Sequence, residues 1–284
     1  AEVQLEIEIE KLGVFGKQAL FTEQNVEQLK TQTKEREAEI EKIKQGKKKR
    51  FGFISTGNLN EDTAKIYTDY TLFTSNPKVL KEVNKVFNFL QVHYKLKKYK
   101  HLIVSPHYTH AALVRMINKE IENKKAGLPN GIKLKLNAIT NFSMINKLYE
   151  ASQAGVPIQM IVRGICSLIP GVKGMSENIE VISIVDRYLE HPRVYAFENG
   201  GNQKVYISSA DFMTRNIENR VEVAAPIYDP SLQKQILDVF DIIWKDNVKA
   251  RYINKTSQNQ FKTNSDKPVR SQWAIFDYYK NLQL

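Results

Sequence analysis

Strand-like segments alternate with amphipathic helical segments along most of this chain, and this alternation constrains the fold more than any other feature. Strands are short and rich in Ile, Val and Leu, whereas a covering helix carries apolar residues at intervals of three and four. We predict strands at residues 51–55, 102–104, 132–139, 158–162, 181–185, 194–197, 205–208 and 221–225. We predict helices beginning near residues 77, 109, 142, 231 and 269. Such alternation is typical of α/β domains.

Two of the predicted helices have clear N-terminal signals. Ser75-Asn76-Pro77 supplies a capping side chain followed by a proline at the first helical position, and Asp229-Pro230 does the same for the last but one helix. We therefore expect both helices to begin at these prolines.

The chain divides by composition. At 284 residues it is long enough for two domains with separate cores. Residues 3–9 and 14–21 have strand character, and residues 22–50, rich in Glu, Lys and Gln, predict a charged helical arm. We predict a first domain at residues 1–98, which includes the arm, and a second domain at residues 99–284.

The charge and cysteine content limit the functional classes. The formal net charge of +11 favours polyanionic partners such as nucleic acid, acidic lipid or inorganic polyphosphate. No apolar run approaches the roughly 20 residues of a membrane-spanning helix. The lone Cys166, in an apolar setting, cannot form an internal disulfide, and no targeting signal opens the sequence, so we expect a reducing cytoplasmic location.

Two similar turns in the two halves of the chain are candidates for phosphate binding. Each is a strand that ends in small hydroxyl residues and an Asn or Asp, and each follows a triplet of an aromatic residue or His, any residue, and a basic residue. The turns are Ser55-Thr56-Gly57-Asn58 and Ser208-Ser209-Ala210-Asp211, and the triplets are Phe15-Gly16-Lys17 and His191-Pro192-Arg193. Small residues let backbone N–H groups and hydroxyls approach phosphate oxygens. The repeat suggests two copies of one catalytic half.

Several single residues have more than one interpretation. His191 suits a phosphate donor, a phosphoryl-accepting nucleophile, or a partly buried histidine that bonds a backbone carbonyl. Arg163 follows a strand, where α/β sheets place ligand-binding groups, but it also suits a surface ion pair. Tyr67 suits stacking on a base or plain packing. His107 and His110 have no third ligand nearby, so we predict no protein metal site.

Longer motifs resemble the C-terminal catalytic half of bacterial polyphosphate kinases. They are residues 55–58 and 63–69 (STGN and TAKIYTD), 163–171 (RGICSLIPG), 182–195 (ISIVDRYLEHPRVY) and 208–216 (SSADFMTRN). The resemblance runs with few interruptions from about residue 51 to the C-terminus.

This resemblance implies two phospholipase-D-like α/β domains with mixed sheets flanked by helices. It also implies reversible transfer of the ATP γ-phosphate to inorganic polyphosphate, with Mg²⁺ and a phosphohistidine intermediate. By position, Tyr67, Arg163 and His191 match family residues that contact ATP, with His191 as the catalytic donor or general acid. From the resemblance together with spacing, we add Arg193, Asn58 and Asp211 as phosphate-binding candidates.

At two positions this sequence has phenylalanine where the family has a histidine that takes part in the reaction. Phe15 stands where the family has its phosphoryl-accepting histidine, and Phe53 stands where it has a second histidine before the STGN turn. Phenylalanine neither accepts a phosphoryl group nor donates a proton. A polyphosphate kinase that lacks its nucleophile is therefore one hypothesis.

A second hypothesis is a non-catalytic module that binds nucleotide or polyphosphate, or a regulatory partner of a complete kinase. Phospholipase-D-like hydrolysis or nuclease action is a weaker hypothesis, because that chemistry uses two His-any-Lys triplets and these are not both present in this sequence. We expect ATP, ADP and polyphosphate as partners and no nucleic acid, together with peripheral membrane association and a homo-oligomer.

Overall fold

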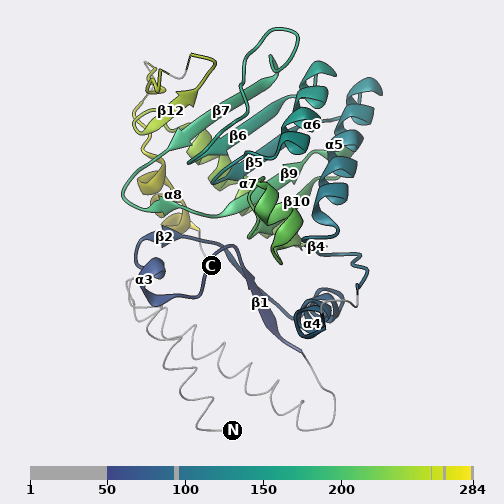
Figure 1. Cartoon of the computed structure of the whole chain (residues 1–284). Helices are drawn as coiled ribbons and strands as arrows, with labels where there is room; N and C mark the ends of the chain where they lie inside the picture. The colour runs from purple at the N-terminus through teal and green to yellow at the C-terminus, as the bar shows by residue number, and fades with distance from the viewer. Residues whose placement is uncertain (1–49, 93–95, 257, 265–266, 283–284) are drawn as a thin grey trace. The chain divides into compact units, whose positions relative to one another are not determined.

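The computed structural model describes residues 50–92, 96–256, 258–264 and 267–282. The predicted strands at 3–9 and 14–21 lie outside these residues, as does the predicted arm at 22–50 except for its last residue. Residues 51–284 form one compact unit. The fold class is α/β, as predicted, with a mixed sheet flanked by helices (Figure 1).

The helices and strands of this unit have the following bounds. The helices are α3 (Glu61–Ala64), α4 (Pro77–Gln91), α5 (Thr109–Lys125), α6 (Phe142–Gln153), α7 (Pro230–Trp244) and α8 (Ser271–Asn281), with a 3₁₀ turn at Asn199–Gly201 and a π turn at Arg215–Asn219. The strands are β1 (Gly52–Ser55), β2 (Tyr67–Thr68), β3 (Thr71–Thr74), β4 (Ile103–Val104), β5 (Ile132–Leu136), β6 (Ile158–Val162), β7 (Ile179–Ile184), β8 (Leu189–Glu190), β9 (Arg193–Phe197), β10 (Lys204–Ser208), β11 (Val223–Ile227) and β12 (Ala250–Ile253).

The largest sheet of the described residues has eight strands in the order β12-β7-β6-β5-β9-β10-β11-β4. Strands β5, β6 and β7 are parallel, and the pairs on either side of them are antiparallel. Two further pairs lie apart from it: β1 with β3, antiparallel, and β2 with β8, parallel. The β2–β8 pair joins residues that are more than a hundred positions apart.

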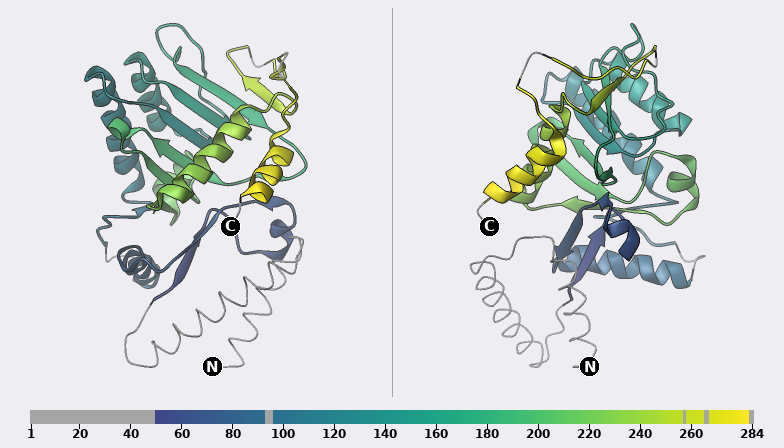
Figure 2. Two further views of the ribbon diagram at one scale, coloured as in Figure 1. Left: turned by 180° about the vertical axis from the view of Figure 1, so that it is seen from behind. Right: turned by 90° about the vertical axis from the view of Figure 1, so that its left-hand side faces the viewer.

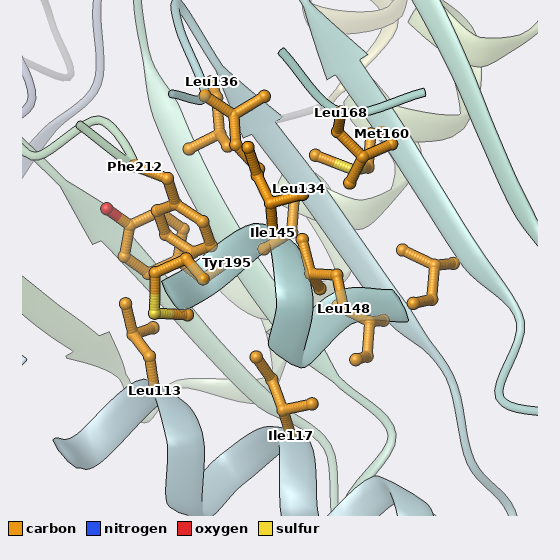
Figure 3. Close-up of a cluster of buried hydrophobic side chains, with 14 of the residues drawn as sticks. Leu113, Ile117, Leu134, Leu136, Ile145, Leu148, Met160, Leu168, Tyr195 and Phe212 are labelled. Carbon is orange, nitrogen blue, oxygen red and sulfur yellow. The ribbon is translucent and has the colours of Figure 1, made fainter. Parts of the chain in front are cut away.

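Helices cover both faces of the large sheet. Helices α5 and α6 lie on one face, and α7 and α8 lie on the other (Figures 1 and 2). The period of two along each strand explains this: Leu134 and Leu136 of β5 pack with α5 and α6, whereas Lys135 between them faces the opposite side. Figure 3 shows the cluster of buried side chains between the sheet and helices α5 and α6, which also contains Tyr195 and Phe212. Because both faces are covered, β6 and β9 are largely apolar, whereas β5 alternates apolar residues with lysines.

The capping signals locate two helix starts correctly. The Asn76 side chain accepts hydrogen bonds from the backbone N–H groups of Lys78 and Val79, and Pro77 is the first residue of α4. Asp229 accepts from the N–H groups at the start of α7 in the same way, ahead of Pro230. Each such cap contributes about 1 kcal/mol.

Several strand predictions needed correction. The strand predicted at 132–139 ends at Leu136, because the chain then bends to place Asn137 among the site residues. The strand predicted at 221–225 is Val223–Ile227, where pairing with β10 sets the register. Strands β3 and β12 were not predicted, since their short, half-polar segments become strands only by pairing with β1 and β7.

Helix α4 and the β1–β3 pair belong to the predicted first domain. Val79 and Val86 of α4 pack in one cluster with Val104, Val194 and Ala225 of the large sheet. The boundary between residues 98 and 99 stays a prediction. Within the described residues, no helix is long and apolar enough to cross a membrane.

Asp246, fully buried after α7, fixes the start of α8. Its Oδ1 accepts from the backbone N–H groups of Val248, Lys249 and Ala250 at 2.7–3.1 Å, and its Oδ2 accepts from that of Ser271 at 2.7 Å. Burial alone would raise the pKa of this carboxyl, but these hydrogen bonds outweigh burial and lower it from its ordinary value of 3.8.

We expect Asp246→Asn to lower the free energy of unfolding by about 1–3 kcal/mol at neutral pH, because the amide turns one acceptor into a donor that faces an N–H. A lowered folded-state pKa contributes stability that is present above the unfolded value and is lost as the pH falls through the folded value. The difference between the variant and the unmodified chain should therefore shrink below about pH 4 in urea titrations. Asp277→Asn, on the exposed face of α8, is the control. An equal loss in the control would contradict the assignment.

Candidate functional site

The site lies where the connection from β8 to β9 meets β2. Parallel pairing of β2 with β8 places Tyr67 opposite Leu189 and Thr68 opposite Glu190. The next residues along the two strands therefore come together, and these are Asp69 and His191.

His191 is held by both of its ring nitrogens. Nδ1 lies 2.9 and 3.1 Å from the two carboxylate oxygens of Asp69, and Nε2 lies 3.0 Å from Nη1 of Arg193. A guanidinium can only donate hydrogen bonds, so Nε2 of the neutral imidazole accepts, and Nδ1 carries the proton that is donated to Asp69. The ring is thus fixed in one tautomer, with Nε2 beside a cation.

Arg193 is buried and carries a buried counter-charge. Its Nη2 donates to Oδ2 of Asp211 at 2.8 Å, and its Nη1 also donates to the backbone carbonyls of His191 at 3.1 Å and Thr56 at 3.3 Å. The other oxygen of Asp211 accepts from the N–H of Asn137 at 2.7 Å. Nε of Arg193 is buried and has no acceptor among the described residues. Asp211 therefore fixes Arg193, while one donor of Arg193 stays unused.

Arg163, just after β6, adds a second cation. Its Nε donates to Oδ1 of Asn137 at 3.0 Å and to the carbonyl of Glu190 at 3.1 Å. Within the part of the chain that the structure describes, its terminal nitrogens make no hydrogen bond. Burial, and after it the charge of Arg193, lowers the pKa of the Arg163 guanidinium. Two like charges near each other with unused donors favour an anionic ligand.

Tyr67 contacts the cluster formed by His191, Arg193 and Arg163, whereas Asn58 does not. The Tyr67 ring packs against the imidazole of His191 with a centroid separation of 4.8 Å. Asn58 is exposed and makes no side-chain hydrogen bond within the described residues. The structure thus brings together five of the six predicted site residues and leaves Asn58 at the edge.

The two repeated turns meet at Arg193. The carbonyl of Thr56, in the first turn, accepts from this arginine, and the carboxylate of Asp211, in the second turn, pairs with it. The similarity that the sequence shows between the two turns therefore corresponds to proximity in space.

Two residues of the site, Asp69 and Asn137, were given no role from the sequence, and Thr56 belongs to the predicted STGN turn. Asp69 orients the imidazole; Asn137 links Arg163 to the carbonyl of His191 at 3.3 Å; and the Thr56 hydroxyl donates to Asp69 at 2.7 Å. Gly57 is required beside them, because an added Cβ would lie 2.0 Å from Oδ2 of Asp69. The signal for Asp69 was its place in the YTDY motif, two residues after Tyr67.

The resemblance implies Mg²⁺, and the side-chain donors near His191 do not meet the requirements of that ion. Mg²⁺ prefers several oxygen ligands in octahedral geometry. The nearby carboxylates of Asp69 and Asp211 are already paired with His191 and Arg193. The described residues contain no group of three or more metal-ligating side chains. They therefore do not build a site for Mg²⁺ themselves.

Family models match both halves of the chain. The model for polyphosphate kinase C-terminal domain 2 matches residues 102–272, and the model for polyphosphate kinase C-terminal domain 1 matches residues 8–96. The chain belongs to the polyphosphate kinase family. The first match contains Arg163, His191, Arg193 and Asp211 of the site.

Polyphosphate kinases from several bacteria are similar to this chain. That of Escherichia coli strain K12 is 49% identical over 245 residues, which are 86% of this chain and 36% of that protein. That of Klebsiella pneumoniae is 51% identical over 235 residues, 82% of this chain and 34% of that protein. The crystal structure of polyphosphate kinase from Porphyromonas gingivalis superimposes with a TM-score of 0.79 and 43% identity, and covers 83% of this chain and 36% of that one. The chain thus spans about a third of the length of these relatives.

Proposed function

We propose that this chain contributes the phosphate-binding centre of a polyphosphate kinase, at which the γ-phosphate of ATP is transferred reversibly to inorganic polyphosphate. In that reaction a terminal polyphosphate oxygen bonds to the γ-phosphorus, and the bond from this phosphorus to the β–γ bridging oxygen breaks. ADP leaves with the electron pair. The observation that carries the proposal is that Arg193 contacts the His191 ring and Arg163 contacts the carbonyl of Glu190 next to it, each with guanidinium donors that make no hydrogen bond among the described residues.

Each site residue has a proposed role in this reaction. Arg163 and Arg193 bind phosphate oxygens, and Tyr67 packs beside the nucleotide. When His191 takes up a second proton, Nε2 gives up its hydrogen bond from Arg193 and donates to the transferring group, and the Asp69 carboxylate at Nδ1 stabilises that imidazolium. Asp211 acts through Arg193, and Asn58 lies at the rim. Mg²⁺ accompanies the phosphates of the substrate.

A second function is a nucleotide- or polyphosphate-binding module without turnover. Phe53, at the position of a family histidine, is 48% exposed on β1 and packs against Phe73 with a ring separation of 5.9 Å, so it offers no proton or nucleophile. Phe15, at the position of the phosphoryl acceptor, lies outside the described residues.

Other features of the whole protein are also proposed. The family models meet near the predicted boundary, which supports a first domain at residues 1–98 and a second at 99–284, both phospholipase-D-like. The net charge of +11 supports contact with polyanions and acidic lipid at a membrane surface. A cytoplasmic location and self-association complete the proposal.

One labelling experiment separates the two functions. The purified chain is incubated with γ-labelled ATP and Mg²⁺, and the protein is tested for acid-labile, base-stable label. Binding of ATP and polyphosphate is measured in parallel. The control variant is His101→Ala, whose imidazole bonds only Tyr228 among the described residues.

We expect phosphate binding that weakens in His191→Ala and persists in the control. Label that disappears only in His191→Ala would mean that this histidine is a phosphoryl acceptor. Binding without label or polyphosphate synthesis favours the module without turnover. Failure to bind either ATP or polyphosphate would overturn both functions.

A further inference from the structure

The segment that carries His191 is held largely by side chains. From the last residue of β8 to the residue before β9, three consecutive backbone carbonyls accept hydrogen bonds from side chains of other segments. Nε of Arg163 donates to the carbonyl of Glu190 at 3.1 Å, Nδ2 of Asn137 donates to that of His191 at 3.3 Å, and Nζ of Lys135 donates to that of Pro192 at 3.3 Å. The direction of the imidazole therefore depends on side chains from β5 and from the loops that follow β5 and β6.

Gln272, in the first turn of α8, pairs with the strand before His191 as a neighbouring peptide would. Its Oε1 accepts from the N–H of Tyr188 at 3.0 Å, and its Nε2 donates to the carbonyl of Tyr188 at 2.9 Å. Nε2 also donates to Oε1 of Glu190 at 2.8 Å. Both N–H groups and the oxygen of this amide are thus used on Tyr188, just before β8, and on Glu190, the last residue of β8.

Glu190 carries the connection to the other side of His191. Its second carboxylate oxygen lies 3.1 Å from Nζ of Lys135, and the two side chains are only 5% and 4% exposed. Lys135 in turn donates to the carbonyl of Pro192. A continuous set of contacts therefore leads from Gln272 through Glu190 and Lys135 to Pro192, so the His191 segment is held from both ends.

Helix α8 is itself firmly anchored near its first residues. The N–H of Ser271 donates to buried Asp246, and Arg270 makes two bonds to Asp186 at 2.8 and 2.5 Å. A cavity of about 170 Å³ lies beside Gln272, lined also by Asp69, Lys135, Glu190 and Tyr279. This space would let the segment shift if the amide of Gln272 were lost.

We propose that Gln272 is a positioning residue for His191, and that α8 thereby sets the geometry of the phosphate-binding centre. The meaning of this role for catalysis rests on the proposed function. The contacts themselves predict that loss of the amide releases the strand at Tyr188 and Glu190, and with it the pairing of His191 with Asp69.

The test is the ¹⁵N spectrum of the histidine side chains of the full chain, at a pH where His191 is neutral, with the His191 signals assigned by their loss in His191→Gln. The unmodified chain should show the pattern of one tautomer, with a protonated Nδ1 and an unprotonated Nε2. Gln272→Met, which keeps the length of the side chain and removes the amide, should lose this single pattern. Lys280→Ala, exposed on the same helix, should keep it.

Gln272→Asn, which keeps an amide but shortens the side chain by one methylene, is a second variant in case the first does not fold. Circular dichroism confirms folding of each. An unchanged His191 pattern in a folded Gln272 variant would overturn the positioning role, whatever the result with labelled ATP. A lost pattern in a chain that binds no ATP or polyphosphate would support positioning and overturn the proposed function, so the two can fail separately.

Discussion

Asp211→Ala is expected to lower the free energy of unfolding by about 3–5 kcal/mol, because it leaves the buried Arg193 guanidinium without a counter-charge. The two side chains are 7% and 10% exposed, and their closest N and O atoms are 2.8 Å apart. The substitution also removes the acceptor for the N–H groups of Asn137 and Ala138. Binding of phosphate should weaken as well, since Arg193 loses its fixed position.

The measurement is urea unfolding followed by circular dichroism and by tryptophan fluorescence. A matched control is Asp241→Ala, which removes an ion pair to Lys133 whose side chains are 47% and 27% exposed. Such a partly exposed pair contributes about 0–1 kcal/mol. If the two alanine variants lost similar stability, the buried pair at the site would not be the strong interaction that its geometry indicates.

The sequence predicted those parts of the fold that depend on local signals. Helices α4 and α7 begin where Asn76-Pro77 and Asp229-Pro230 place them, because a cap is satisfied within one turn. Strands β6 and β9 were found because apolar residues on both faces of a covered sheet form a dense run, and β5 was found because its apolar residues alternate with lysines. Strand β12 was missed because its four residues, Ala250–Ile253, are too few and too mixed in polarity to predict a strand without the pairing with β7.

In the site, too, the sequence predicted the residues that lie in local motifs and missed the partners that are distant along the chain. His191, Arg193 and Asp211 lie in recognisable motifs, and the structure brings them together. The partners that orient them were not predicted, since Asp69 lies 122 positions from His191 along the chain and Asn137 lies 54 positions from it. The type of a residue in a motif indicates its chemistry, but only the sheet topology shows which distant side chain fixes its direction.

The buried pair of Lys135 and Glu190 gives the second large effect. Lys135→Met alone should lower the free energy of unfolding by about 3–5 kcal/mol, since the Glu190 carboxylate then stays buried without its cation. The double variant Lys135→Met with Glu190→Gln should lose less than Lys135→Met alone, because neither charge of this pair remains and the new amide oxygen still accepts from Gln272. The exposed pair of Lys119 with Glu122 supplies the control Lys119→Met.

The pH dependence gives the same pair a second test. Burial lowers the pKa of the Lys135 ammonium, and the charge of Glu190 opposes this only in part. Between the lowered folded value and the ordinary value of 10.5, the unfolded chain binds the proton that the folded chain has released, so stability rises with pH in that interval. Lys135→Met should lack this rise, whereas Lys119→Met should keep it.

A double variant as unstable as the sum of the two single variants would show that Lys135 and Glu190 act independently. The connection from Gln272 to Pro192 would then not pass through them.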